Sequence, residues 1–145
     1  MTKPQHYGNY VRLVPAFHFI LVPLGMISLA AAIVYFFLSV SHGDSLLASL
    51  LFVSLSLMMV MTMVLSRIFA CKAQDRAIRA EENLRHFALT GKLLDPRLTM
   101  NQIIALRFAS DEQFLSLCEK AVKDRIAPDA IKREITSWRA DHHRV

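Results

Sequence analysis

The stretch from Ser45 to Leu89 constrains the fold of this chain more than any other part of its sequence. Its first part, from Leu46 to Leu65, is apolar and uncharged, and its second part, from Arg67 to Phe87, is rich in charge. Neither part contains Gly or Pro, so nothing between its ends predicts the end of a helix. A single helix of this length would measure roughly 65 Å, of which about 30 Å would match the hydrocarbon core of a bilayer. We therefore expect one long helix that crosses a membrane and continues into water.

A heptad pattern of mostly small side chains runs along this predicted helix. Its members are separated by alternating steps of three and four residues: Ser49, Phe52, Ser56, Met59, Met63, Ser66, Ala70, Ala73, Ala77, Ala80, Leu84 and Phe87. Small side chains let another backbone come close, so the pattern favours association with a second copy or with a larger partner. Two other interpretations stay open. The face packs against another part of the same chain, or its alanines face water because Ala is the best helix former.

A second apolar segment, residues 16–40, precedes this helix and contains no Lys, Arg, Asp or Glu. It is too long for a cleaved signal peptide, so we expect a first transmembrane helix. Pro23 lies inside it and should kink the helix, because it removes the hydrogen bond to the carbonyl near Phe19. Small residues at helical spacing form a stripe that is expected to lie against Ser49 and Ser56 of the second helix. The members of this stripe are Gly25, Ser28 and Ala32.

The charges beside the two apolar segments predict their orientation. Lys3 and Arg12 precede the first segment, and the short connection at residues 41–45 contains no Lys or Arg. The second segment is followed by Arg67, Lys72, Arg76 and Arg79. Because positive residues stay cytoplasmic, both termini are expected inside, and the formal net charge of +5 indicates topology rather than nucleic-acid binding. Tyr7 and Tyr10 suit the lipid headgroup layer.

The C-terminal part of the sequence predicts a cap of three short helices. Gly91 is the expected end of the long helix. Two capping boxes, Thr99 with Gln102 and Ser110 with Gln113, predict the starts of the first two short helices.

Pro128 is expected to open the third of these helices, with Ile131, Ile135 and Trp138 on one face. The charges of the cap nearly balance, so it lacks the basic face of a nucleic-acid reader. No alternating pattern typical of a strand occurs in the sequence.

The predicted fold is therefore all-α: an integral membrane helical hairpin, a long second helix extending into a cytoplasmic stalk, and a small three-helix C-terminal cap. Its segments are a cytoplasmic N-terminal segment (1–15), transmembrane helix 1 (16–40), an external turn (41–45), transmembrane helix 2 (46–66), a cytoplasmic stalk (67–90) and the cap (91–145).

No pattern typical of a catalytic or metal site occurs in the sequence. There is no glycine-rich phosphate loop, nucleophile elbow or zinc-binding helix motif, and Cys71 and Cys118 have neither metal nor redox spacing. His18 lies near the edge of the first apolar segment, where it serves either as an interfacial hydrogen-bonding group or as a proton relay. We therefore expect no catalytic residues, no metal, no cofactor and no enzymatic activity.

Two stretches resemble a family of small bacterial two-span membrane proteins of unknown function. They are PQHYGNYVRLVPAFH at residues 4–18 and LTGKLLDPRLT at residues 89–99, the latter continuing with QIIALRFASD at residues 102–111. Tyr10 stands where that family would have a histidine. The resemblance implies a bacterial inner-membrane protein and singles out six polar positions: Arg12, His18, Asp95, Arg97, Arg107 and Asp111. For Arg107 and Asp111, which are four residues apart, we expect a tie across the corner between two helices.

These observations lead to one functional hypothesis and two alternatives. The hypothesis is a non-enzymatic membrane scaffold that self-associates as a homo-oligomer through the second helix and the stalk. The first alternative is an accessory subunit of a larger membrane transport or respiratory complex, and the second is an oligomeric channel or transporter. The expected partners are the lipid bilayer and other copies of the chain, or the larger complex, but no nucleic acid. The expected location is the bacterial inner (cytoplasmic) membrane, with both termini in the cytoplasm.

Overall fold

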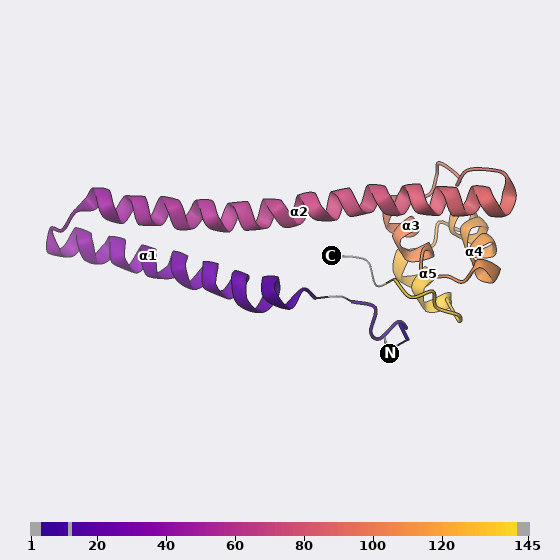
Figure 1. Cartoon of the computed structure of the whole chain (residues 1–145), viewed down its shortest axis with the longest axis horizontal. Helices are drawn as coiled ribbons and strands as arrows, with labels where there is room; N and C mark the ends of the chain where they lie inside the picture. Colours follow the sequence, from indigo (N-terminus) through magenta and orange to yellow (C-terminus); the bar gives the residue numbers. More distant parts are fainter. Residues whose placement is uncertain (1–3, 12, 142–145) are drawn as a thin grey trace. The chain divides into compact units, whose positions relative to one another are not determined.

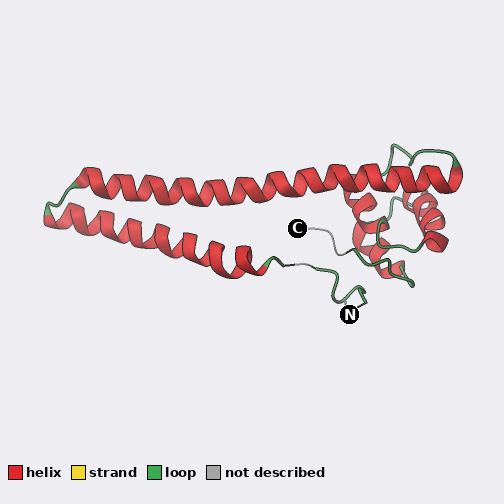
Figure 2. Cartoon of the chain, in the orientation of Figure 1, coloured by secondary structure: helices red, strands yellow, loops and turns green. Residues whose placement is uncertain are grey.

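The computed structural model describes residues 4–11 and 13–141, and these residues form helices, turns and loops without a strand (Figures 1 and 2). This confirms the predicted all-α class. The chain divides into two compact units. One, residues 13–70, is called the hairpin below. The other, formed by the described parts of residues 1–12 and 71–145, is called the cap unit.

The hairpin consists of two long helices joined by a short turn (Figure 1). A π-helix, η1 (Ala16–Leu21), leads into α1 (Val22–His42), and α2 begins at Leu46. The α1 helix ends at Gly43, whose φ of 76° lies in the left-handed region that favours glycine. The helical segment thus continues two residues beyond the expected boundary at residue 40.

A π-helix directly precedes Pro23, in the segment where the sequence predicts a kink. Pro23 occupies the first turn of α1, where it cannot donate a backbone hydrogen bond. The N–H of Val22 reaches back five residues to the carbonyl of Phe17, which is the hydrogen-bond pattern of a π-turn.

The α2 helix (Leu46–Thr90) is a single helix of 45 residues, as expected. Residues 46–70 belong to the hairpin and residues 71–90 to the cap unit. Gly91 ends the helix as predicted, with a φ of 71° and a hydrogen bond of 2.7 Å from its N–H to the carbonyl of Phe87.

Both long helices are long and apolar enough to cross a membrane, over Ala16–His42 and Leu46–Thr90. Within the chain, only 11% of the most apolar window of the first and 6% of that of the second are buried. These helices are therefore not covered by the rest of the chain in the way that a core helix of a soluble protein is.

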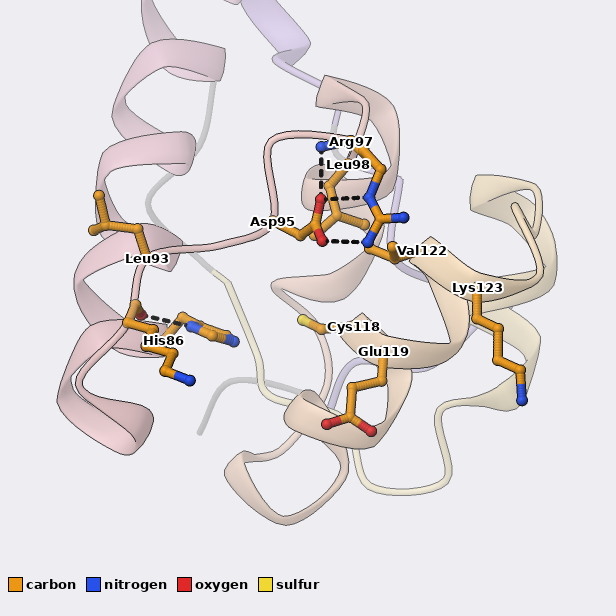
Figure 3. A pocket seen from close by; sticks show the side chains of 10 residues that line it. His86, Leu93, Asp95, Arg97, Leu98, Cys118, Glu119, Val122 and Lys123 are labelled. Carbon is orange, nitrogen blue, oxygen red and sulfur yellow. Dashed lines mark hydrogen bonds and ion pairs between the residues drawn. The ribbon is translucent and has the colours of Figure 1, made fainter.

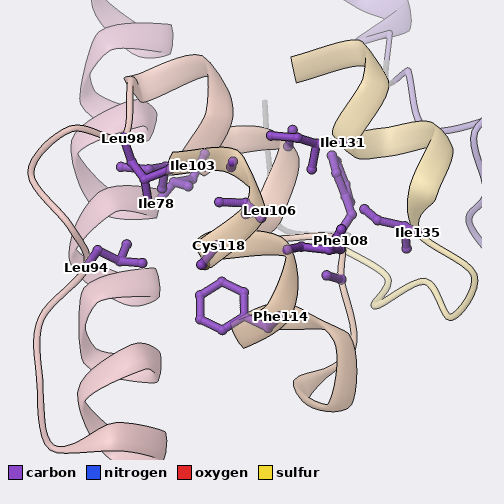
Figure 4. Packing of buried hydrophobic residues seen from close by; sticks show 14 residues of the cluster. Ile78, Leu94, Leu98, Ile103, Leu106, Phe108, Phe114, Cys118, Ile131 and Ile135 are labelled. Atoms are coloured by element: carbon purple, nitrogen blue, oxygen red, sulfur yellow. The ribbon is translucent and has the colours of Figure 1, made fainter. Parts of the chain in front are cut away.

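In the cap unit, three short helices pack with the end of α2 around one apolar core (Figure 4). They are α3 (Met100–Leu106), α4 (Asp111–Lys123) and α5 (Pro128–Glu134). The α2 helix contributes Ile78, and the loop after it contributes Leu94 and Leu98. Phe108, Phe114, Leu106 and Ile131 are the largest apolar side chains that are fully buried.

One of the two predicted capping boxes is present. Thr99 and Gln102 form it at the start of α3. Ser110 is the N-cap of α4, so the predicted start of this helix is confirmed, but the predicted capping box with Gln113 is absent because the Ser110 side chain makes no capping hydrogen bond. The Gln113 side-chain oxygen instead accepts hydrogen bonds from the backbone N–H groups of Thr136 and Ser137, both at 3.1 Å. The Gln113 side chain thereby holds the segment after α5.

The expectation that Trp138 continues the third short helix is also wrong. The α5 helix ends at Glu134, and Ile135 is extended with a ψ of 115°. The following segment pairs with the loop between α3 and α4 through a β-bridge between Ala109 and Trp138 and a 2.7 Å hydrogen bond from Arg139 N–H to the Phe108 carbonyl. These backbone bonds replace the bonds that a longer α5 would have made.

The N-terminal segment packs on the cap, whereas the sequence suggested that its tyrosines lie among lipid headgroups. The Tyr10 ring lies 6.2 Å from the Trp138 ring and 6.0 Å from the Phe108 ring. Gln5 exchanges two hydrogen bonds with the backbone of Asp141, at 2.8 and 3.2 Å. Tyr10 packs there because Trp138, which lies beyond the end of α5, presents a flat aromatic surface to it.

Candidate functional site

The part of the heptad pattern that lies in the cap unit is exposed in a single chain. We call its five residues the stalk seam: Ala73, Ala77, Ala80, Leu84 and Phe87. Leu84 is 67% exposed and Phe87 is 52% exposed, which are high values for large apolar side chains on a helix that also carries a cap. The interpretation that this face packs within the chain is therefore not what the structure shows.

The cap covers a different face of α2. The buried residues of this part of the helix are Ile78 and Glu82, which are 5% and 4% exposed, with Arg85 half-buried beside them. At about 100° per residue, the middle of this face is about 150° from the middle of the stalk seam. The seam thus lies almost opposite the cap and is free of it.

In the hairpin, by contrast, part of the same pattern faces α1. Ser49 is fully buried and Met63 is 9% exposed, while Ser56 is half-buried. The remaining members are exposed: Phe52, Met59, Ser66 and Ala70. In the hairpin, α1 therefore covers part of the heptad pattern of α2.

The small-residue stripe of α1 lies on the inner side of the hairpin. Gly25 and Ala32 are buried and Ser28 is half-buried. A Cβ added at Gly25 would meet the side chains of Met63 and Val60 at 3.7 Å. A groove of about 350 Å³ between α1 and α2 is lined by Ser28, Ala31, Ala32, Tyr35, Phe52 and Ser56.

Arg85 connects α2 to the cap through several contacts at once. Its guanidinium contacts Glu82 at 3.1 Å and Asp111 at 2.6 Å, and donates a hydrogen bond of 2.7 Å to the carbonyl of Ala109. The same group lies 4.2 Å from the centre of the Phe114 ring. Its side chain is only 9% exposed, so these interactions are screened by water far less than those of a surface ion pair.

Glu82 is the acidic partner at the centre of this arrangement. Burial raises the pKa of its carboxyl group above the ordinary value, against the opposing effect of Arg85 and of Arg139, which lies 3.8 Å away. The Glu82 carboxylate thus contacts Arg85 within α2 and, through Arg139, the segment after α5. We assign it a structural role.

Of the six positions that the family resemblance singled out, Asp95, Arg97, Arg107 and Asp111 lie in the cap unit, where they form separate contacts, and His18 lies in the hairpin. Asp95 and Arg97 form an exposed pair at 2.7 Å within the turn after α2, and the hydrogen bonds from Arg97 lower the pKa of Asp95 to about 2. His18 accepts a local hydrogen bond of 3.2 Å from the N–H of Val14. Arg12 lies outside the described residues.

The expected tie between Arg107 and Asp111 is wrong. Arg107 is buried and pairs with Asp141 at 3.3 Å, whereas Asp111 pairs with Arg85. The segment after α5 lies beside the corner between α3 and α4, and this places the Asp141 carboxylate next to Arg107.

The sequence predicts that Arg85 pairs with Glu81, and this prediction is wrong; Glu82, the partner that the structure shows, was missed. Glu81 and Glu82 both precede Arg85 at helical spacing, and a pair four residues apart favoured Glu81. The structure selects Glu82, three residues away, because it shares the buried face with Ile78. The spacing of Ile78, Glu82 and Arg85 was the available signal for that face.

A pocket of about 520 Å³ opens between the end of α2, the loop after it and α4 (Figure 3). His86 lies on one side, where its Nδ1 is 2.7 Å from the carbonyl of Lys92, and Cys118 lies on α4. Burial raises the pKa of the Cys118 thiol to about 12, so it stays protonated near neutral pH and is a poor nucleophile.

The described residues contain no group of three or more His, Cys, Asp or Glu side chains placed to hold a metal ion. The protein is all-helical, with two long apolar helices and a small cap that packs on the end of the second helix. The model of a family described as "Family of unknown function (DUF6526)" matches residues 1–145, and the chain belongs to this family. The predicted membership of an uncharacterised family is confirmed. No curated protein and no solved structure matches the chain.

Proposed function

We propose that this chain is a two-span protein of the bacterial inner membrane, with both termini in the cytoplasm, that acts as a non-enzymatic scaffold by self-associating through the stalk seam. The observation that carries the proposal is the seam itself, an apolar strip of α2 that is exposed and lies almost opposite the cap. An exposed apolar surface of this kind on a folded unit is typical of an interaction site.

The membrane assignment is supported by the exposure of the hairpin. Its outward-facing side chains are large and apolar on both helices, including Phe19 and Ile27 on the first and Leu47 and Phe69 on the second, each more than 60% exposed. Such a surface would be unstable in water and matches the hydrocarbon interior of a bilayer.

The topology is supported by the way in which the described N-terminal residues fold. The segment before the first apolar helix and the segment after the second belong to one compact unit, with Tyr10 packed against Phe108 and Trp138. A folded unit cannot be divided by a bilayer, so both ends of the hairpin lie on one side. The basic residues next to the apolar segments favour the cytoplasmic side.

The scaffold assignment is supported by the contacts that the charged side chains of the cap unit make within the chain. Arg85, Glu82, Arg107 and Asp111 are engaged in joining α2, α3, α4 and the C-terminal segment to one another. Their contacts explain why they are present without invoking a substrate. The stalk seam is the surface that these contacts leave unexplained.

The test is a purification of the full chain in mild detergent followed by a native mass measurement. We expect a defined oligomer, and we expect Leu84→Glu to convert it to the monomer by placing a charge in the interface. Leu93→Glu is the matched control, because Leu93 is 66% exposed and lies outside α2. A native chain that is only monomeric would overturn the proposal. Unrelated chains that co-purify in fixed ratio would favour the accessory-subunit alternative instead.

A further inference from the structure

The heptad register of the stalk places two opposite charges beside the seam. With Ala77 and Leu84 at position a, and Ala73, Ala80 and Phe87 at position d, Arg76 falls at position g and Glu81 at position e. Positions e and g flank the a and d core of a coiled coil and form ion pairs between its helices. In a parallel pair of helices, a g residue lies beside the e residue five positions later in the partner, which is the separation of Arg76 and Glu81.

Arg76 and Glu81 are both exposed, and neither forms an ion pair among the described residues. The nearby basic residue that could have engaged Glu81 within the helix is Arg85, which pairs with Glu82 and Asp111 instead. The cap therefore leaves both charges available on the two flanks of the exposed seam.

We propose, building on the self-association proposed above, that the occupant of the stalk seam is a second copy of this chain, packed parallel and in register, with Arg76 paired to Glu81 of the partner subunit. The two-fold symmetry of such a pair produces this contact twice. The charge pattern is thus complementary to itself in one orientation.

The antiparallel arrangement lacks this complementarity. It would place g beside g and e beside e, so that Arg76 would lie near basic or neutral g positions and Glu81 near e positions. Two copies that cross one membrane with the same topology also present their second helices parallel. The electrostatic and the topological arguments therefore select the same orientation.

The geometry also favours two strands over more. The seam is a narrow a and d strip whose flanks are polar, at Gln74, Arg76, Glu81 and Asn83. Assemblies of more helices bury the flanking positions as well, which would be costly for these residues. The three alanines of the seam let the paired helices approach closely, while Leu84 and Phe87 supply most of the apolar area at its end.

The experiment is a charge exchange in the full chain in mild detergent, read as the dissociation constant of the dimer. Arg76→Glu and Glu81→Arg each convert two attractive pairs into two repulsive ones, so each should weaken the dimer about tenfold. The double variant restores opposite charges and should return the dissociation constant to within about twofold of the native value. Arg79→Glu is the matched control, because Arg79 is exposed at position c and should leave the dimer unchanged.

Cross-linking provides a second reading of the same register. Ala77→Cys should form a disulfide between the two copies on mild oxidation, whereas the native chain, whose Cys71 lies at position b, should not. A monomeric native chain would overturn the proposed function and this inference together. A native chain that associates, but with neutral charge exchanges and no cross-link at position 77, would overturn this inference alone.

Discussion

The hairpin and the cap unit place small and large side chains in opposite ways. In the hairpin, the buried residues are small at Gly25, Ala32 and Ser49, with Met63 as a large exception, while Phe19 is 66% exposed. In the cap unit, the large side chains Phe108 and Phe114 are buried. One chain of 145 residues thus combines a region suited to an apolar solvent with a region suited to water.

This difference teaches where stability comes from in each region. The cap unit is stabilised by removing large apolar groups from water, so its weak points are inside. In the membrane that we propose for it, the hairpin would gain little from burial of that kind, because lipid is as apolar as its own side chains, and would depend on close packing of small residues. The α2 helix belongs to both regions, and it is in the cap unit that its seam remains uncovered.

The largest expected effect tests the burial of aromatic residues. Phe114→Ala should destabilise the cap unit by about 4 kcal/mol, because Phe114 is fully buried and packs beside Arg85. Phe19→Ala, at a residue that is 66% exposed in the hairpin, should change the folding free energy by less than about 0.5 kcal/mol. Hydrogen exchange in the full detergent-solubilised chain measures both, at the cap amides for Phe114→Ala and at the hairpin amides for Phe19→Ala. Equal effects of the two changes would contradict the comparison.

A slightly smaller effect is expected at the polar link between α2 and the cap. Arg85→Met removes the partner of Glu82 and of Asp111, and should cost about 3 kcal/mol because it leaves a carboxylate buried. The same measurement on Arg97→Met is the control, since the Arg97 side chain is 73% exposed and the loss of its surface pair with Asp95 should have a far smaller effect than the Arg85 change. Retention of full protection in the Arg85 variant would show that apolar contacts alone hold the cap on α2.

The parts of the fold that follow from local pattern were predictable from the sequence. The continuity of α2, its end at Gly91 and the capping box at Thr99 depend on residues close together in the chain. What could not be predicted depends on long-range competition. The Gln113 side chain accepts hydrogen bonds from the segment after α5 instead of capping α4, and Arg107 pairs with Asp141 rather than with Asp111.

The candidate site shows the same division. The heptad pattern marked the seam, and the small-residue stripe of the first helix predicted contact with Ser49 and Ser56, but neither pattern indicated that the cap would leave the stalk part exposed. That outcome required the structure, because burial at Ser49 and exposure at Leu84 arise from different neighbours.

Two substitutions of Gly25 test how much side-chain volume the packing between α1 and α2 tolerates. Gly25→Ala adds a Cβ at an ordinary contact distance of 3.7 Å from Met63 and Val60, so it should be tolerated. Gly25→Leu must displace those side chains and should destabilise the hairpin by about 2 kcal/mol. The amount of dodecyl sulfate needed to unfold the hairpin measures both variants. If the Leu variant resists it as well as the Ala variant, close packing is not what joins α1 to α2.

The smallest expected effect is a pH dependence that arises in the cap unit. Because burial raises the pKa of Glu82, the folded chain binds a proton at this group more readily than the unfolded chain does. Its contribution to stability is therefore fully present below the ordinary pKa of 4.5 and is lost as the pH rises through the raised value. Glu82→Gln removes this group, so the stability of the native chain minus that of the variant should fall as the pH increases from about 4 and then become constant. Asp95, whose pKa is lowered to about 2, has the opposite pH dependence, but it is present in both proteins and cancels in the difference. Cap hydrogen exchange across this pH range supplies the difference, and a difference that rises with pH would mean that Arg85 and Arg139 stabilise the Glu82 carboxylate more than burial destabilises it.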